Sequence, residues 1–71
     1  MSADDLIRMA NQIAAFAEAY PEDEAVAMVA DHIAKFWARG MRDEMAALLA
    51  EGVAGLTPLA ERGARRALEA D

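Results

Sequence analysis

The sequence predicts an all-α protein, a small bundle of three to four short helices that forms a single domain over residues 1–71. Three observations predict this fold class. Alanine, the strongest helix former, accounts for 19 of the 71 residues. Apolar residues recur every three or four positions in successive segments, as they do on one face of a helix. The residues that punctuate these segments are Pro21, Gly40, Gly52, Gly55 and Pro58.

The first predicted helix begins at Ser2, an N-cap residue type, with Asp5 three positions later and Asp4 favouring the positive end of the helix dipole. Pro21 ends this segment because the residue before a proline is pushed out of helical geometry. The apolar face of this helix is predicted to contain Leu6, Met9, Ala10, Ile13, Phe16, Ala17 and Tyr20.

The second predicted helix has Pro21 in its first turn, followed by three acidic residues where the helix dipole favours negative charge. Gly40 is predicted to stop this helix at its C-terminus. A third, shorter helix is predicted from about Met41 to Ala50. The apolar face of the second helix is predicted to contain Val26, Val29, Ala30, Ile33, Phe36 and Trp37.

The last predicted helix opens at Thr57 and Pro58, which suit the N-cap and first helical positions, and it runs towards Ala70. Its apolar face is poor, and Gly63 in its middle costs about 1 kcal/mol relative to alanine. The pattern therefore predicts that this helix frays or is held by something outside the chain.

The composition argues against several kinds of site. The chain has no cysteine and one histidine, so neither a disulfide nor a structural zinc site can be assembled. Ser2 and Thr57 both look like helix caps, and neither has a base nearby in sequence. No glycine-rich phosphate loop follows a predicted strand. We expect no catalytic, cofactor-binding or metal site in this chain.

Charge and hydropathy limit the kinds of partner. The formal net charge is −6, and residues 1–24 contribute −5 of it. This acidic segment repels phosphate backbones, which counts against nucleic acid as a partner. Apolar runs are shorter than the ~18 residues of a membrane span, and the first residues lack the basic and apolar regions of a signal peptide. We expect a cytoplasmic protein that binds neither membranes nor nucleic acid.

Two regions of the second helix are candidates for a protein interface. Met28 projects away from the predicted apolar face. It is either an ordinary exposed methionine or part of a second apolar patch with Ala25 and His32. His32 itself is expected to be either a partly exposed residue at the edge of the apolar face or a hydrogen-bond partner at an interface. Phe36 and Trp37 are 100° apart on the helix and cannot both point to the centre of one small core. We predict that Trp37 reaches the rim and anchors a partner; a core position is the alternative.

Two polar clusters complete the candidates. Asn11 and Gln12 are adjacent inside the first helix, where an exposed asparagine has mediocre helix propensity and suggests an intermolecular hydrogen bond. Three arginines lie close together in the last helix, either as a solvated face with ion pairs four residues apart or as a contact for an acidic patch on a partner. These arginines are Arg62, Arg65 and Arg66.

Several short motifs give the sequence a family resemblance over about residues 6–68. They are Met9-Ala10-Asn11-Gln12-Ile13 followed by Phe16, then His32 with Phe36-Trp37 and Met41-Arg42, and finally Gly55-Leu56 with Pro58-Leu59. This pattern resembles the delta subunit of cytosolic NAD-dependent formate dehydrogenase. The resemblance adds Met41 and Arg42 to the residues expected at the partner interface.

The resemblance implies a place in a multi-subunit complex that oxidises formate to carbon dioxide. In that family a large subunit holds the molybdenum or tungsten pterin cofactor and iron–sulfur clusters, and other subunits hold FMN and the NAD site. The delta subunit is credited with none of these cofactors. We therefore expect a non-catalytic accessory subunit that docks on the catalytic assembly, most directly on the large subunit, and supports its assembly or stability. The alternative is a free-standing regulator or maturation factor that binds the enzyme transiently.

Overall fold

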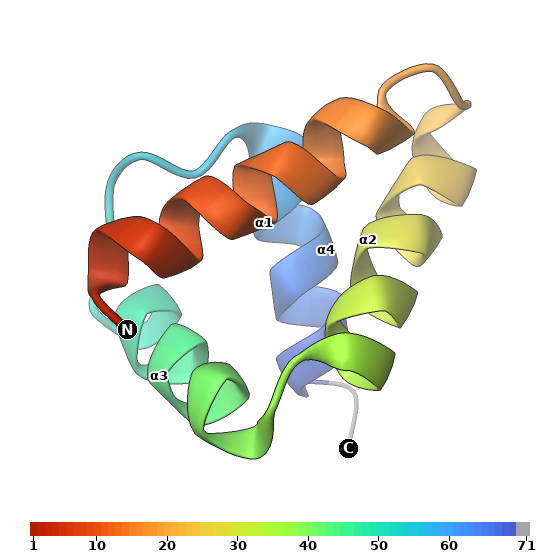
Figure 1. Cartoon of the computed structure of the whole chain (residues 1–71). Helices are drawn as coiled ribbons and strands as arrows, with labels where there is room; N and C mark the ends of the chain where they lie inside the picture. Colours follow the sequence, from red (N-terminus) through yellow and green to blue (C-terminus); the bar gives the residue numbers. More distant parts are fainter. Residues whose placement is uncertain (70–71) are drawn as a thin grey trace.

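The computed structural model describes residues 1–69, and they form four helices joined by short connections. The helices are α1 (Ala3–Ala17), α2 (Glu22–Phe36), α3 (Arg39–Ala50) and α4 (Pro58–Glu69). Helix α4 packs against all three others and lies behind them in the view of Figure 1. No strand occurs within the described part of the chain, and the predicted all-α fold class is confirmed.

Helix α1 begins at the capping box that the sequence suggested. The Ser2 Oγ accepts a hydrogen bond from the Asp5 N–H at 3.2 Å, and the Asp5 carboxylate accepts one from the Ser2 N–H at 3.3 Å. These two bonds satisfy backbone donors that a helix start otherwise leaves unpaired. Helix α1 ends at Ala17, before the predicted limit at Tyr20, and Pro21 is the N-cap of α2 rather than a residue of its first turn.

Helix α2 ends earlier than the sequence predicted, because the turn is made at Trp37 and Ala38. Both residues have extended backbone, and Ala38 is already the N-cap of α3. Gly40 therefore lies in the first turn of α3, and its predicted role as a helix stop is wrong. The glycine that does stop a helix is Gly52, which has a φ of 73° after α3. Its N–H donates to Leu49 and the next N–H donates to Leu48, the hydrogen bonds of a Schellman motif.

Helix α4 is held by contacts within the chain, so the expectation that it frays or needs support from outside the chain is wrong. The Thr57 Oγ1 caps it by accepting from the Ala60 N–H at 3.3 Å. Its buried face consists of Ala60, Gly63 and Ala64, and Gly63 lies directly against Val29 of α2. Because that face has no large side chains, α4 packs by close backbone approach, which the spacing of large apolar residues does not reveal.

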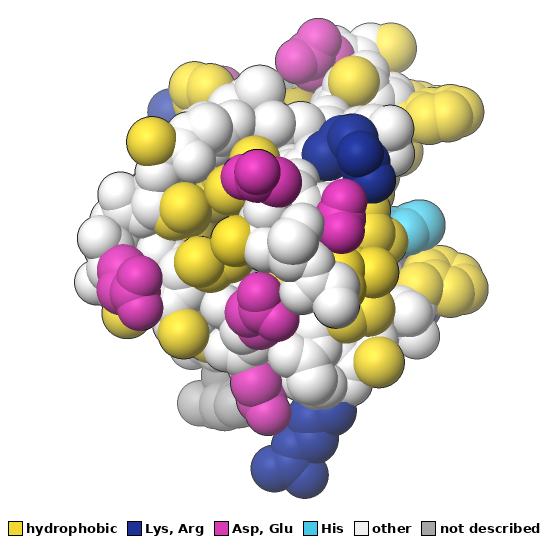
Figure 2. All heavy atoms as spheres, turned by 60° about the vertical axis from the view of Figure 1, so that its left-hand side comes forward, with side chains coloured by type: hydrophobic (Ala, Val, Ile, Leu, Met, Phe, Trp, Pro, Cys, Tyr) yellow, Lys and Arg dark blue, Asp and Glu magenta, His cyan; other side chains and the backbone are white. Residues whose placement is uncertain are grey.

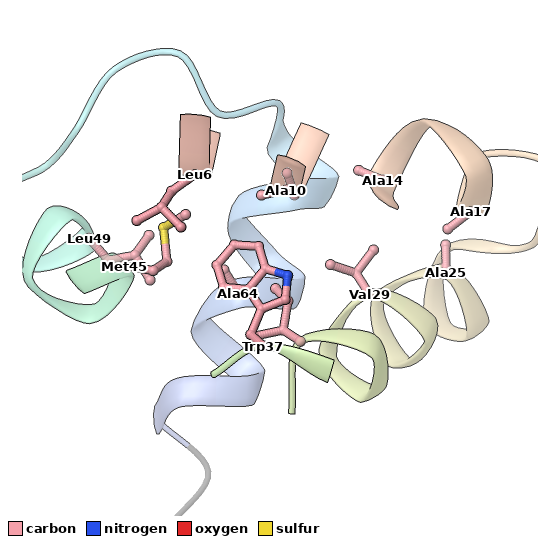
Figure 3. Packing of buried hydrophobic residues seen from close by; sticks show 12 residues of the cluster. Leu6, Ala10, Ala14, Ala17, Ala25, Val29, Trp37, Met45, Leu49 and Ala64 are labelled. Atoms are coloured by element: carbon pink, nitrogen blue, oxygen red, sulfur yellow. The ribbon is translucent and has the colours of Figure 1, made fainter. Parts of the chain in front are cut away.

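The core is built from a few large side chains set among alanines. Figure 3 shows the Trp37 ring between Val29 of α2 and the Met45 and Leu49 side chains of α3. Alanines form the buried contacts nearest the α1–α2 turn, where Ala17 faces Ala25. Because alanine faces bring helices close together, these contacts leave no room for a ring. Three residues predicted on the apolar faces, Phe16, Tyr20 and Phe36, are exposed, and those three assignments are wrong.

Within residues 1–69, no helix combines the length and apolar character that a membrane crossing requires.

Candidate partner-binding surface

Large apolar side chains stand out from the surface on one side of the α1–α2 pair. Phe16 is 84% exposed, Phe36 is 72% exposed and Met28 is 37% exposed. Figure 2 shows hydrophobic side chains projecting on either side of the histidine at the right-hand edge of the molecule. A groove lies between the two helices here, and we call it the α1–α2 groove. It is lined by Gln12, Ile13, Phe16, Ala17, Met28 and His32.

The spacing of residues along each helix explains how this groove forms. Gln12 and Phe16 are four residues apart on α1, and so are Met28 and His32 on α2, so each pair lies on one flank of its helix. Phe36 continues the α2 row by one more turn, and its ring contacts the His32 ring with centroids 4.9 Å apart and planes tilted by 44°. Tilted aromatic contacts of this kind are favourable, and this one orients His32 beside the groove.

The apolar patch predicted around Met28 is present, but a different set of residues forms it. Met28 and His32 belong to it, but Ala25 is buried in the core. The other side of the groove comes from α1, where Phe16 was assigned to the core. One signal in the sequence pointed to the surface position: Phe16 lies one helical turn after Gln12, which is exposed.

Asn11 has a different role from the predicted intermolecular one. Its Nδ2 donates to the Gly55 carbonyl at 2.9 Å, and its Oδ1 accepts from the Thr57 N–H at 3.0 Å. Both partners lie in the loop before α4, so Asn11 fixes that loop to α1. Adjacent helical residues point about 100° apart, which is why Asn11 faces the loop while Gln12 faces the groove.

The predicted anchor Trp37 lies in the core, with 5% of its surface exposed. The expectation that one of the two neighbouring rings reaches the rim is confirmed, but that ring is Phe36. The backbone at Trp37 has left the helix, so the 100° helical spacing used for the prediction no longer applies to it. Met41 packs against the core, and Arg42 lines a separate hollow between α3 and α4. Neither of these two residues lines the α1–α2 groove.

The late arginines form ion pairs on the surface. Arg65 pairs with Glu61 at 3.0 Å and with Glu69 at 3.3 Å, and Arg62 pairs with Glu22 across α2 and α4. The hydrogen bond to Glu61 raises the pKa of Arg65 above its usual value. The predicted ion pairs four residues apart are confirmed for Arg65, whereas the pair of Arg62 joins two helices.

The few side chains with reactive groups are engaged in local structure. The Ser2 and Thr57 hydroxyls cap α1 and α4, and the His32 ring contacts Phe36. Hydrogen bonds from Ser2 hold the pKa of Asp5 below its ordinary value. Across residues 1–69, three or more His, Asp or Glu side chains do not come together as a metal site would require.

The fold and the groove define a small all-helical protein with an exposed apolar groove between its first two helices. Residues 5–64 match the family model of the NADH-dependent formate dehydrogenase delta subunit FdsD. The match spans most of the chain, so the protein belongs to this family and is a delta subunit of NAD-dependent formate dehydrogenase. The resemblance read from the sequence motifs is thereby confirmed. No curated protein and no solved structure is significantly similar to the chain.

Proposed function

We propose that this delta subunit is a single-domain, non-catalytic accessory subunit that docks on the catalytic assembly of formate dehydrogenase in the cytoplasm and supports its assembly or stability. The large catalytic subunit is its main contact. The molybdenum or tungsten pterin, the iron–sulfur clusters, FMN and NAD belong to the other subunits. The observation that carries this proposal is the exposed apolar surface of the α1–α2 groove on a chain of this family.

The energetics of that surface support a binding role. Transferring a phenylalanine side chain from water into an apolar contact stabilises a complex by about 1.5–3 kcal/mol. The rings of Phe16 and Phe36 are mostly exposed in the free chain, so nearly all of that stabilisation is still available to a partner. Aromatic residues, including phenylalanine, and methionine are enriched at protein interfaces relative to the rest of the surface. A subunit that binds only the assembled state then stabilises it by mass action.

The non-catalytic assignment is supported by what the candidate reactive groups already do. A nucleophile needs a neighbouring base, and the hydroxyls of Ser2 and Thr57 are instead paired with backbone N–H groups at helix starts. His32 would be the natural base, and its ring contacts Phe36 on the exposed side of α2.

Co-expression of the complete complex with and without this chain tests the proposal. We expect the chain to stay with the other subunits through gel filtration. Omitting it should lower the yield or the melting temperature of the complex, while formate-dependent NAD reduction per cofactor-loaded complex stays unchanged. A chain that elutes separately, while its omission lowers cofactor loading, would instead indicate a transient maturation factor. Loss of turnover in a fully assembled and loaded complex would contradict the non-catalytic assignment.

A further inference from the structure

The α1–α2 groove has an acidic end. Glu24 lies one helical turn before Met28 on α2, so Glu24, Met28, His32 and Phe36 form one row along the helix. Asp23 adds a second carboxylate in the first turn of α2, while Glu18 and Glu22 line a separate hollow with Tyr20 and Arg62. Residues 18–24 contain four acidic residues and no basic one, and of these four Glu22 is paired with Arg62.

The lining of the groove and the charge at its end specify different features of the occupant. The groove offers Phe16, Met28 and Ile13, so whatever covers it must present large apolar side chains. The acidic end favours a cationic group on the partner and repels an anionic one. A second copy of this chain carries a net charge of −6 and has the same acidic end, so electrostatic repulsion disfavours it as the occupant.

We infer that the α1–α2 groove receives an amphipathic helix of another formate dehydrogenase subunit, with a Lys or Arg placed next to Glu24. Such a helix presents apolar side chains three and four residues apart, a spacing that fits a groove between two helices. This inference rests on the proposed function and adds to it the position and the chemistry of the contact.

Two pairs of matched variants test the apolar and the charged parts of the contact. Phe16→Asp adds a charge at the groove, and Tyr20→Asp adds the same charge at another exposed ring, in the separate hollow that contains Leu59 and Arg62. Glu24→Lys reverses a charge in the first turn of α2, and Asp4→Lys does so in the first turn of α1, away from the groove. The full-length tagged chain is co-expressed with the other subunits, and its retention is measured by gel filtration over a dilution series. Circular dichroism verifies that each variant is folded.

We expect Phe16→Asp to weaken association about thirtyfold or more, the effect of losing an interface hot spot, and Tyr20→Asp to leave it nearly unchanged. Glu24→Lys should weaken association several-fold more than Asp4→Lys, and added salt should reduce that difference. Equal effects within each pair would overturn the inference while leaving the accessory role intact. An isolated chain that is dimeric, and that Phe16→Asp makes monomeric, would assign the groove to a second copy and refute the inference. A wild-type chain that never stays with the other subunits would refute both proposals.

Discussion

Replacing Gly63 with alanine is expected to destabilise the protein, although alanine is the better helix former. Gly63 is buried in α4 against α2. A Cβ atom at this position would come well inside 3.0 Å of both the Cβ and the Cγ1 of Val29, a separation that real Cβ atoms essentially never show. The Val29 Cβ is bonded directly to the backbone and cannot rotate away. The two helices must therefore move apart to accept the methyl group.

Two opposing contributions to the free energy of unfolding set the size of the effect of Gly63→Ala. The change from glycine to alanine in a helix interior contributes about 1 kcal/mol of stability. Forcing an extra carbon into a well-packed core typically costs about 1–3 kcal/mol, and contact with two atoms of one side chain places this case at the upper end. We expect a net loss of stability of about 2 kcal/mol. For a domain of this size, about 1 kcal/mol shifts the melting temperature by roughly 4–8 °C, so the melting temperature should fall by roughly 8–16 °C.

Thermal unfolding followed by circular dichroism measures this effect, with Gly40→Ala as the matched control. Gly40 is exposed in the first turn of α3, and a Cβ there meets nothing within 4 Å, so this variant should gain about 0.5–1 kcal/mol. In the double variant Val29→Ala/Gly63→Ala the contact with Cγ1 is gone while the contact with Cβ remains, so its loss of stability should be less than the sum of the single losses. A rise in melting temperature for Gly63→Ala similar to that for Gly40→Ala would refute this account of the α2–α4 contact.

Three further predictions follow from buried or hydrogen-bonded side chains. Trp37→Ala should cost about 3–5 kcal/mol and reduce helicity, because the ring lies in the core; a variant that stays fully helical but loses partner binding would contradict this position. Asn11→Ala should cost about 1–2 kcal/mol in chemical denaturation because two loop hydrogen bonds are lost, whereas Gln12→Ala should stay within about 0.5 kcal/mol. Asp5 has a lowered pKa in the folded chain, so its contribution to stability is present above the ordinary carboxyl pKa and is lost as pH falls through the lowered value. Asp5→Asn should flatten this acid dependence in melts recorded over pH, and an unchanged dependence would exclude Asp5 as its source.

The positions of the helices could be read from the sequence because their signals are local. Ser2 and Asp5 cap α1, Thr57 caps α4, and Pro21 separates the first two helices, each through hydrogen bonds or sterics within a turn or two of chain. The family could also be recognised from the sequence, because its motifs are short and occur in a fixed order. The boundary misplaced at Gly40 arose because a glycine is permitted at a helix stop without being required there.

The directions of the side chains were decided by the tertiary structure. Phe16 is exposed because α1 and α2 pack through Ala17 and Ala25 beside it, which brings these helices too close for a ring to fit between them. Phe36 is exposed at the other end of α2. Trp37 enters the core because the backbone turns at that residue. Gly63, which reads as a weak point in an isolated helix, is where α2 and α4 come into contact. Periodicity reports which residues share a face of one helix, but the distance between two helices depends on both faces together, and that distance determines which rings are buried and which remain exposed to a partner.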